Sequence, residues 1–241
     1  QYELMIGGKE LWGGKIAKLF PRPEIQRMCS SFANVELNSH APFYAIGNEV
    51  LGVATDEFYT KWKLDPIFRK RIRFIEEKAS SDDALEVTAA LAFLEGAVLF
   101  AVFGFFKGFN SRGFNLIPHF VSGIDGSAKD EDFHSRGSAM LFNICKAERI
   151  SNGTHSQSQE NRLYKTIQKI AGDVYLHELE IIDKLFAIPG NRVVNRHELT
   201  HFLRDRIDTV LVRLGSLTIC GEAEGLISTW FDPPPRTVKV S

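Results

Sequence analysis

The chain has 241 residues, 44% of them hydrophobic, and its 29 basic and 30 acidic side chains give a formal net charge of -1. This balance excludes a global electrostatic attraction to nucleic acid or to an anionic membrane, and the composition excludes a disordered or fibrous chain. The three cysteines, Cys29, Cys145 and Cys220, lie too far apart along the chain to indicate a disulfide framework or a thiolate metal site. We therefore expect one domain over residues 1–241 in the reducing cytoplasm, with neither nucleic acid nor a membrane as a partner.

The predicted secondary structure is almost entirely helical, because apolar residues recur at intervals of three and four and no alternating strand pattern runs far. Proline, glycine and capping residues mark the boundaries, for example Pro23 before one helix, Asp83 before another and Pro189-Gly190 between two more. The predicted helices span residues 1–18, 24–52, 56–79, 81–107, 117–149, 159–187, 195–217 and 221–230. The fold class that we expect is all-α, a helical bundle.

The segment 24–52 carries Glu36 and His40, which are four residues apart and share a helix face, and Tyr44 follows one turn later. Pro42 should disturb this helix, because proline removes one backbone hydrogen bond and clashes with the carbonyl group one turn earlier. A π-bulge between Glu36 and His40 would relieve both problems, and such bulges are frequent at functional sites. The pattern thus predicts a local π-helix at a pair of candidate metal ligands.

The stretch Val87 to Phe106 is long enough to cross a bilayer, and its only polar residues are Thr88 and Glu95. No second stretch of this kind exists, so we interpret it as the central helix of a soluble bundle, apolar on all sides because other helices surround it. Glu95 then needs a partner, since an ionised carboxylate in a dry core is tolerated only when it is paired or bound to metal.

Glu131 and His134, three residues apart in the segment 117–149, form a second pair on one helix face. Alone, such a pair is more typical of an exposed polar turn. The preceding connection is rich in Gly, Asn and Pro, however, so the two helices can lie antiparallel and bring Glu95 opposite the pair. With Glu3 as the acidic residue of the first apolar stretch, separate helices could hold two metal ions in the core.

Several stretches carry a resemblance to one known family. They are Leu94-Glu95-Gly96 followed by Lys129-Asp130-Glu131-Asp132-Phe133-His134; Ser31-Phe32-Ala33 leading to Glu36, His40, Tyr44 and Asn48-Glu49-Val50-Leu51-Gly52; and the ending Ile227-Ser228-Thr229-Trp230 with Val238-Lys239-Val240-Ser241. Over almost its whole length the chain resembles the small, radical-generating subunit of class I ribonucleotide reductase, which is a ferritin-like helical bundle.

The resemblance implies a site and partners. The implied metal ligands are Glu3, Glu36, His40, Glu95, Glu131 and His134, and they would hold two ions, with iron expected first and manganese or a mixed pair as alternatives. Tyr44 corresponds to the radical tyrosine, Asp130 to the aspartate that orients a ligand histidine on the electron route, and Leu99 and Phe103 to the apolar pocket around the radical. The implied partners are the large reductase subunit, where nucleotides are reduced, and a second copy of the chain in a homodimer.

Three features depart from the family pattern. The first ligand is usually Asp, whereas Glu3 is one methylene longer, which leaves the metal open. One extra residue separates Glu36 from His40, so either the bulge restores the geometry or the site is altered. We also expect the chain to be part of a longer protein, without the family's N-terminal segment that holds a relay tryptophan and without its flexible C-terminal tail.

Other functions compete with this interpretation. His197-Glu198-Leu199-Thr200-His201 matches the helix motif of zinc metalloproteases, with Glu222 or Glu224 as a possible third ligand. Asn195 and Glu198 also fit a capping box at a helix start, which gives the motif a structural explanation. A ferritin-like ligand-binding oxidase, a ferroxidase or a metal-free scaffold could share the bundle. His177-Glu178-Leu179-Glu180 is interpreted as a solvated helix face.

Overall fold

A computed structural model describes residues 2–190, 193–219 and 225–231, and this part of the chain contains helices and no strand. The all-α prediction is therefore confirmed. The elements are α1 (Tyr2–Ile6), η1 (Trp12–Ile16), α2 (Ala17–Leu19), α3 (Pro23–Val35), η2 (Glu36–His40), α4 (Ala41–Val50), α5 (Asp56–Lys61), α6 (Pro66–Ser80), α7 (Ala84–Gly96), α8 (Phe100–Gly108), α9 (Pro118–Ser151), α10 (Gln157–Leu185), α11 (Arg196–Arg213) and α12 (Ser228–Phe231), where η1 and η2 are π-helices.

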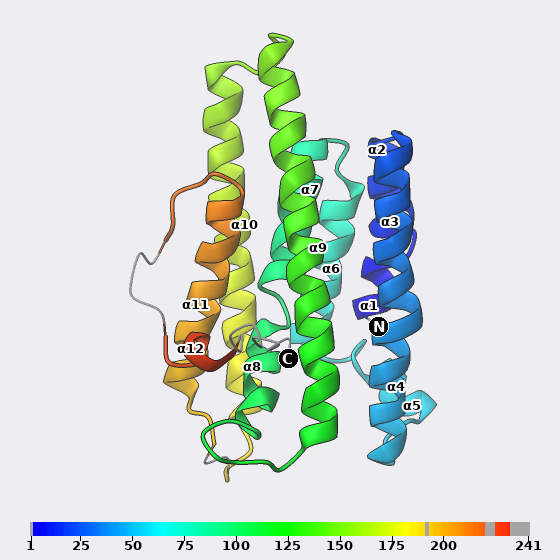
Figure 1. Cartoon of the computed structure of the whole chain (residues 1–241), viewed down its shortest axis with the longest axis vertical. Helices are drawn as coiled ribbons and strands as arrows, with labels where there is room; N and C mark the ends of the chain where they lie inside the picture. Colours follow the sequence, from blue (N-terminus) through cyan, green and yellow to red (C-terminus); the bar gives the residue numbers. More distant parts are fainter. Residues whose placement is uncertain (1, 191–192, 220–224, 232–241) are drawn as a thin grey trace, which may run out of the picture.

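Helices α7 and α9 form the centre of the bundle and make its most extensive contact. In Figure 1, α9 runs between α10 and α11 on one side and the rod formed by α3, η2 and α4 on the other. The two central helices are antiparallel, as predicted. Ser135 Oγ donates to Ala92 O at 2.9 Å and Ser138 Oγ donates to Thr88 O at 2.8 Å, so the residue numbers rise along α9 as they fall along α7. This arrangement brings Glu95, at the end of α7, to the middle of α9.

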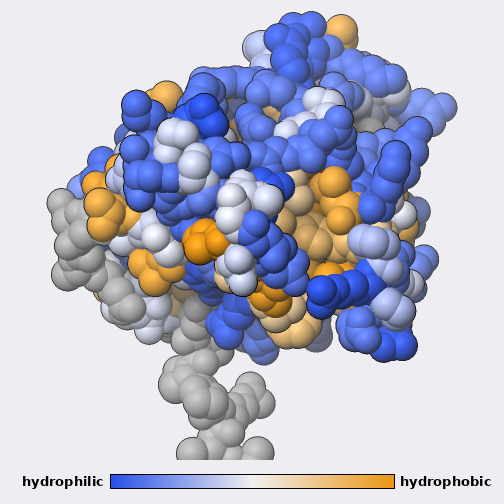
Figure 2. Space-filling model, turned by 90° about the horizontal axis from the view of Figure 1, so that it is seen from above, coloured by the Kyte–Doolittle hydropathy of each residue, from blue (hydrophilic) through white to orange (hydrophobic). Residues whose placement is uncertain are grey.

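The apolar stretch lies in the core of the bundle, as the sequence predicted. The segment Ala84–Gly108 is long and apolar enough to cross a membrane, but 78% of its most hydropathic window is buried inside the protein. Burial on every side explains why this segment lacks a polar face. The face seen in Figure 2, viewed from above the bundle, is mainly hydrophilic and includes smaller hydrophobic areas.

Two of the predicted helices are shorter than expected. Residues 56–79 divide into α5 and α6, because Pro66 starts a new helix whose first N–H groups are capped by Asp65 Oδ1, 2.9 Å from Ile67 N. Residues 1–18 divide after α1 at Gly7, where a Cβ atom would lie 2.6 Å from Glu36 Cβ. The glycine therefore allows α1 to approach η2 closely and carries Glu3 to the site.

The prediction of one helix over residues 81–107 was wrong. Helix α7 ends at Gly96 and α8 begins at Phe100, with Leu99 between them in the left-handed region at φ 75°. Gly96 packs tightly against α11, since an added Cβ would lie 2.5 Å from Val210 Cγ2. The break leaves the Gly96 carbonyl group without its helical partner, and Arg206 Nε donates a hydrogen bond to it at 3.0 Å.

Arg206 holds the helix break in place, so its loss should destabilise the protein. Its guanidinium group also lies 3.8 Å from the centroid of the Phe100 ring and 2.8 Å from Asp132 Oδ1. We expect Arg206→Met to lower the free energy of unfolding by about 2–3 kcal/mol, because it leaves a buried carbonyl group unpaired. Urea titration should measure this loss, with the exposed Arg196→Ala as an unchanged control. A value equal to that of the wild type would contradict this role.

Candidate metal centre

Six buried side chains converge between α1, η2, α7 and α9. They are the six predicted ligands Glu3, Glu36, His40, Glu95, Glu131 and His134, and each is at most 5% exposed. The six side chains form two groups whose ligand atoms lie within 4.8 Å of one another: Glu3, Glu36, His40 and Glu131 in one, and Glu36, Glu95, Glu131 and His134 in the other. Because Glu36 and Glu131 belong to both groups, the arrangement is that of two adjacent cation positions with two shared carboxylates.

The two imidazole rings point the same type of nitrogen at the shared carboxylates. His40 Nδ1 lies 3.0 Å from Glu36 Oε2 and 3.3 Å from Glu131 Oε1. His134 Nδ1 lies 2.6 Å from Glu36 Oε1 and 3.5 Å from Glu131 Oε2. Each ring therefore presents its Nδ1 to one of the two positions.

The donor set fits a pair of divalent cations. Many of the buried ligand atoms make no well-directed hydrogen bond, among them Glu3 Oε2, Glu95 Oε2 and both Glu131 oxygens, although the imidazole nitrogens approach the Glu36 and Glu131 oxygens to ion-pair distance. Buried polar atoms are normally paired, so this concentration of unpaired atoms indicates a missing partner at their centre. Four carboxylates would balance the charge of two divalent ions, and mixed carboxylate and imidazole ligands suit iron and manganese.

Without metal, the cluster is electrostatically strained. Burial raises the pKa of Glu3 and of Glu95, and the negative charge of Glu131 raises both further. Burial works against the charged form of His40 as well, yet hydrogen bonds from its ring to Glu131 and Glu36 raise the pKa of His40 to about 11. The metal-free cluster therefore holds protons at neutral pH.

Metal binding should release these protons. Metal ligands must be deprotonated, so protons on Glu3, Glu95 and His40 compete with the cation. Because the pKa values are raised, affinity should increase as the pH rises through the neutral range. Calorimetric titration with Mn²⁺ in two buffers of different ionisation enthalpy should show net proton release at pH 7. A heat that is independent of the buffer would contradict this prediction.

Two further residues singled out in the sequence, Asp130 and Tyr44, lie beside the cluster. His40 Nε2 lies 3.2 Å from Asp130 Oδ2, so Asp130 orients the ring whose other nitrogen faces the cluster. The Asp130 side chain is 49% exposed, and it connects the site with the surface. Tyr44 keeps its hydroxyl oxygen buried and without a hydrogen-bond partner. Burial raises the pKa of Tyr44, and the charges of Glu3 and Glu131 add to this effect, which places the hydroxyl group near the cluster.

The two residues expected to form the apolar pocket around Tyr44 lie beyond the break in the helix. Phe103 is buried on α8, whereas Leu99 is partly buried in the left-handed connection between α7 and α8. The helix break thus separates both residues from Glu95, which lies near the end of α7.

The predicted π-helix is present. Residues Glu36–His40 form η2, which continues α3 into α4 without interruption, and Pro42 lies in the first turn after it. A π-helix takes one more residue per hydrogen-bonded turn than an α-helix. The extra residue between Glu36 and His40 is thereby absorbed, and both side chains remain buried at the cluster.

Removing the extra residue should preserve the site. Deletion of the exposed Asn38 would convert η2 to an α-helix and leave Glu36 and His40 three residues apart on one face. We expect the deletion variant to bind the same number of metal ions as the wild type and as an Asn38→Ala control. An added alanine after Asn38 should abolish binding. Loss of metal in the deletion variant, measured by elemental analysis, would show that η2 is required rather than tolerated.

Two aromatic residues near the cluster were not predicted from the sequence. Trp12 is fully buried on η1, and its Nε1 donates a hydrogen bond to Glu95 Oε1. Tyr2 donates from its hydroxyl group to Leu94 O at 2.6 Å. Neither residue has a spacing that identifies it, because each contacts α7 from a position 92 (Tyr2) or 83 (Trp12) residues away in the sequence.

The zinc-protease motif has another role in this structure. Asn195 caps α11 by accepting a hydrogen bond from Glu198 N at 2.8 Å, as expected, and the Glu198 carboxylate lies 3.0 Å from Arg112. Glu222 and Glu224 lie outside the described residues. Within the described ranges, the candidate metal groups are the two groups that share Glu36 and Glu131.

The protein is an all-α bundle that buries four carboxylates and two histidines in two overlapping ligand groups. These features are those of ferritin-like proteins with a dinuclear metal site. Similarity to known protein families identifies one family within this class. The family model of the ribonucleotide reductase small chain matches residues 8–222, and the chain belongs to this family.

One solved structure supports the fold. A crystal structure from Bacillus halodurans that carries the name class I ribonucleotide reductase superposes with a TM-score of 0.68 and 17% sequence identity. The match covers 84% of this chain and 72% of that chain. A search of curated protein sequences finds none that matches this chain. At this identity, the structural match supports the fold alone.

Proposed function

We propose that this chain generates and stores the oxidising equivalent used by the large subunit of ribonucleotide reductase to make deoxyribonucleotides. The observation that carries the proposal is the pair of four-residue groups that share Glu36 and Glu131. Two iron or manganese ions bound there would make a reaction with dioxygen possible and would provide a one-electron oxidant. The protein then has to position the ligands, exclude water and provide a residue that can be oxidised.

Tyr44 is the residue that we assign to this last role. Its hydroxyl oxygen is buried near the cluster, which shields it from water, and the carboxylates of Glu3 and Glu131 act on the same group. When the side chain is oxidised, a deprotonated carboxylate of the cluster such as Glu3 would accept the proton. Asp130 connects His40 with the surface and is the proposed start of the electron route to the large subunit. Phe103 and Leu99 are proposed to shield the radical from water.

The other ferritin-like functions lack an equivalent of this pair. A ferroxidase or a ligand-binding oxidase needs the metal ligands, but it has no need for a shielded tyrosine or for an aspartate that connects a ligand histidine with the surface. Tyr44 and Asp130 therefore favour the reductase subunit. We place this function in the cytoplasm, where ribonucleotides are reduced.

The test is loading followed by spectroscopy. The metal-free chain is first loaded under anaerobic conditions with Fe²⁺, with Mn²⁺ or with an equal mixture of the two. It is then exposed to air and examined by electron paramagnetic resonance and elemental analysis. The proposal predicts two metal ions per chain and a tyrosyl or mixed-metal signal for at least one loading. Complete iron oxidation without any radical or mixed-metal signal would favour a ferroxidase and contradict the proposal.

A homodimer is part of the proposal, and α9 offers a surface for it. Phe133, Met140 and Ile144 are 63%, 49% and 49% exposed, and their spacing places them on one face of α9. Exposed apolar side chains that lie together are typical of interaction surfaces. Light scattering should give the mass of two chains for the wild type and of one chain for Met140→Glu. A monomeric wild type would contradict the dimer.

A further inference from the structure

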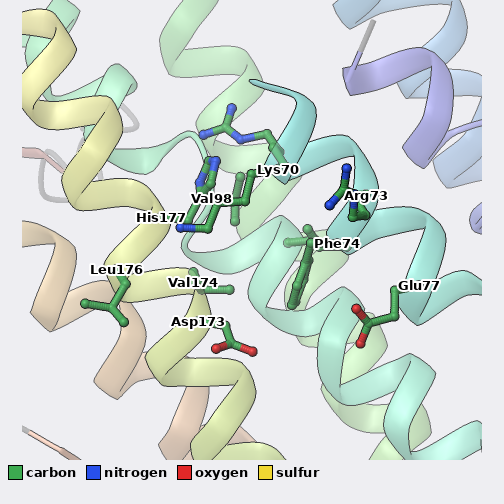
Figure 3. A pocket seen from close by; sticks show the side chains of 11 residues that line it. Lys70, Arg73, Phe74, Glu77, Val98, Asp173, Val174, Leu176 and His177 are labelled. Carbon is green, nitrogen blue, oxygen red and sulfur yellow. The ribbon is translucent and has the colours of Figure 1, made fainter. Parts of the chain in front are cut away.

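A cavity of about 260 Å³ lies next to the metal centre but outside it. Figure 3 shows its labelled side chains gathered from α6 and α10, with Val98 from the connection between α7 and α8. The lining residues are Lys70, Arg71, Arg73, Phe74, Glu77, Leu94, Val98, Asp173, Val174, Leu176 and His177. The volume is near the lower end of the roughly 300–1,000 Å³ typical of small-molecule sites.

One wall of the cavity contradicts a sequence prediction. His177 and Glu178, expected on a solvated helix face, are only 7% and 0% exposed. They are buried because they form a polar network with α6, in which Arg71 Nη2 lies 2.5 Å from Glu178 Oε1 and His177 Nδ1 lies 3.0 Å from the same oxygen. His177 Nε2 lies 3.1 Å from the carbonyl oxygen of Ile67.

The network leaves one donor free at the cavity. Arg71 is 8% exposed, and its Nε is buried without a hydrogen-bond partner. A buried guanidinium N–H without an acceptor is costly, so it points to a partner that the protein itself does not provide. Glu178 Oε2 is unpaired too, but Glu178 does not line the cavity.

The other charges around the cavity are mostly paired with residues at the surface. Lys70 lies 2.7 Å from Glu180, Glu77 lies 3.1 Å from Lys78, and Asp173 lies 2.6 Å from Lys169. Arg73 is exposed and, among the described residues, has no carboxylate within the 4.0 Å of an ion pair. The donors that remain for a ligand are thus Arg71 Nε, on a guanidinium group whose Nη2 already pairs with Glu178, and the guanidinium group of Arg73, and such donors favour an anion.

The rest of the lining is apolar, with Phe74, Leu94, Val98 and Val174 as its main surfaces. An inorganic phosphate would leave these surfaces unused and would find few donors. We propose that the cavity binds a monocarboxylate with a short apolar chain, whose carboxylate pairs with Arg71 and Arg73 and whose chain lies against Phe74, Leu94, Val98 and Val174.

The probe for this site is octanoate, titrated calorimetrically into the full chain in both the metal-free and the metal-loaded form. We expect saturable binding of one octanoate per chain in both forms. Binding should be at least tenfold tighter than that of acetate, which lacks the chain, and of octan-1-ol, which lacks the charge. Arg73→Ala lies at the surface and should weaken octanoate severalfold without changing the binding of octan-1-ol.

Two variants on α10 locate the ligand. Val174→Phe fills the cavity and should lower the affinity for octanoate at least tenfold. Ile167→Phe changes a buried residue of the same helix that lies outside the cavity, so the affinity for octanoate should stay unchanged. The proposal would be overturned if octan-1-ol or acetate bound as tightly as octanoate. Binding of octanoate only to the metal-loaded form would overturn it as well. The readout is independent of the radical, so it can fail while the proposed reductase function holds.

Discussion

Replacing Glu131 by alanine should abolish the binding of both metal ions. The carboxylate of Glu131 belongs to both ligand groups, and its loss leaves each position with three protein ligands and Glu36 as the one carboxylate that the two positions share. We expect elemental analysis after anaerobic loading and desalting to fall from two metal ions per chain to nearly none. Metal-free Glu131→Ala should still fold, because the change removes one of four mutually repelling buried carboxylates.

The strength of this prediction lies in its comparison with a residue of only one group. Glu95→Ala removes a ligand from the second position and leaves Glu3, Glu36, His40 and Glu131 intact, so about one ion per chain should remain. Glu148→Ala, an exposed change on the same helix as Glu131, should retain two. Two ions retained in Glu131→Ala would mean that the shared carboxylate is not a ligand.

Changing Tyr44 to phenylalanine should remove the organic radical and leave the metal content unchanged. The variant keeps the ring and loses the buried hydroxyl group that has no hydrogen-bond partner. We expect the tyrosyl signal in electron paramagnetic resonance to fall at least tenfold after loading with iron and exposure to air, while two metal ions per chain remain.

Tyr2 provides the matched control. It also lies beside the cluster and is partly buried, desolvation and the charge of Glu95 raise its pKa, and its hydroxyl group donates to Leu94 O. A backbone carbonyl group is a poor acceptor for a transferred proton, whereas the carboxylates of Glu3 and Glu131 act on the Tyr44 hydroxyl group and can accept its proton, so Tyr2 should be oxidised less readily than Tyr44. Tyr2→Phe should therefore keep the signal. If the signal survives in Tyr44→Phe and disappears in Tyr2→Phe, the assignment is reversed.

The parts of the site that follow helical spacing could be predicted from the sequence. Glu36 with His40 and Glu131 with His134 share faces, Glu95 is the charge within an apolar helix, and Pro42 indicates the π-helix that the structure contains. Each of these features leaves a local signal, because periodicity and proline sterics act within one or two turns.

Features that depend on contacts distant in sequence could not be predicted. The end of α7 at Gly96 follows from the approach of α11 and from Arg206, 110 residues away. Trp12 contacts Glu95 across 83 residues, after a connection in which Gly7 and Gly8 leave no room for a Cβ atom. His177 and Glu178 look like a polar surface until α6 places Arg71 against them. A local pattern does not contain these tertiary partners.

Anomalous diffraction from crystals loaded with Mn²⁺ would test the central claim most directly. The account predicts two peaks per chain, one among Glu3, Glu36, His40 and Glu131 and the other among Glu36, Glu95, Glu131 and His134. A single peak, no peak between α7 and α9, or a peak at His197 and His201 would contradict it.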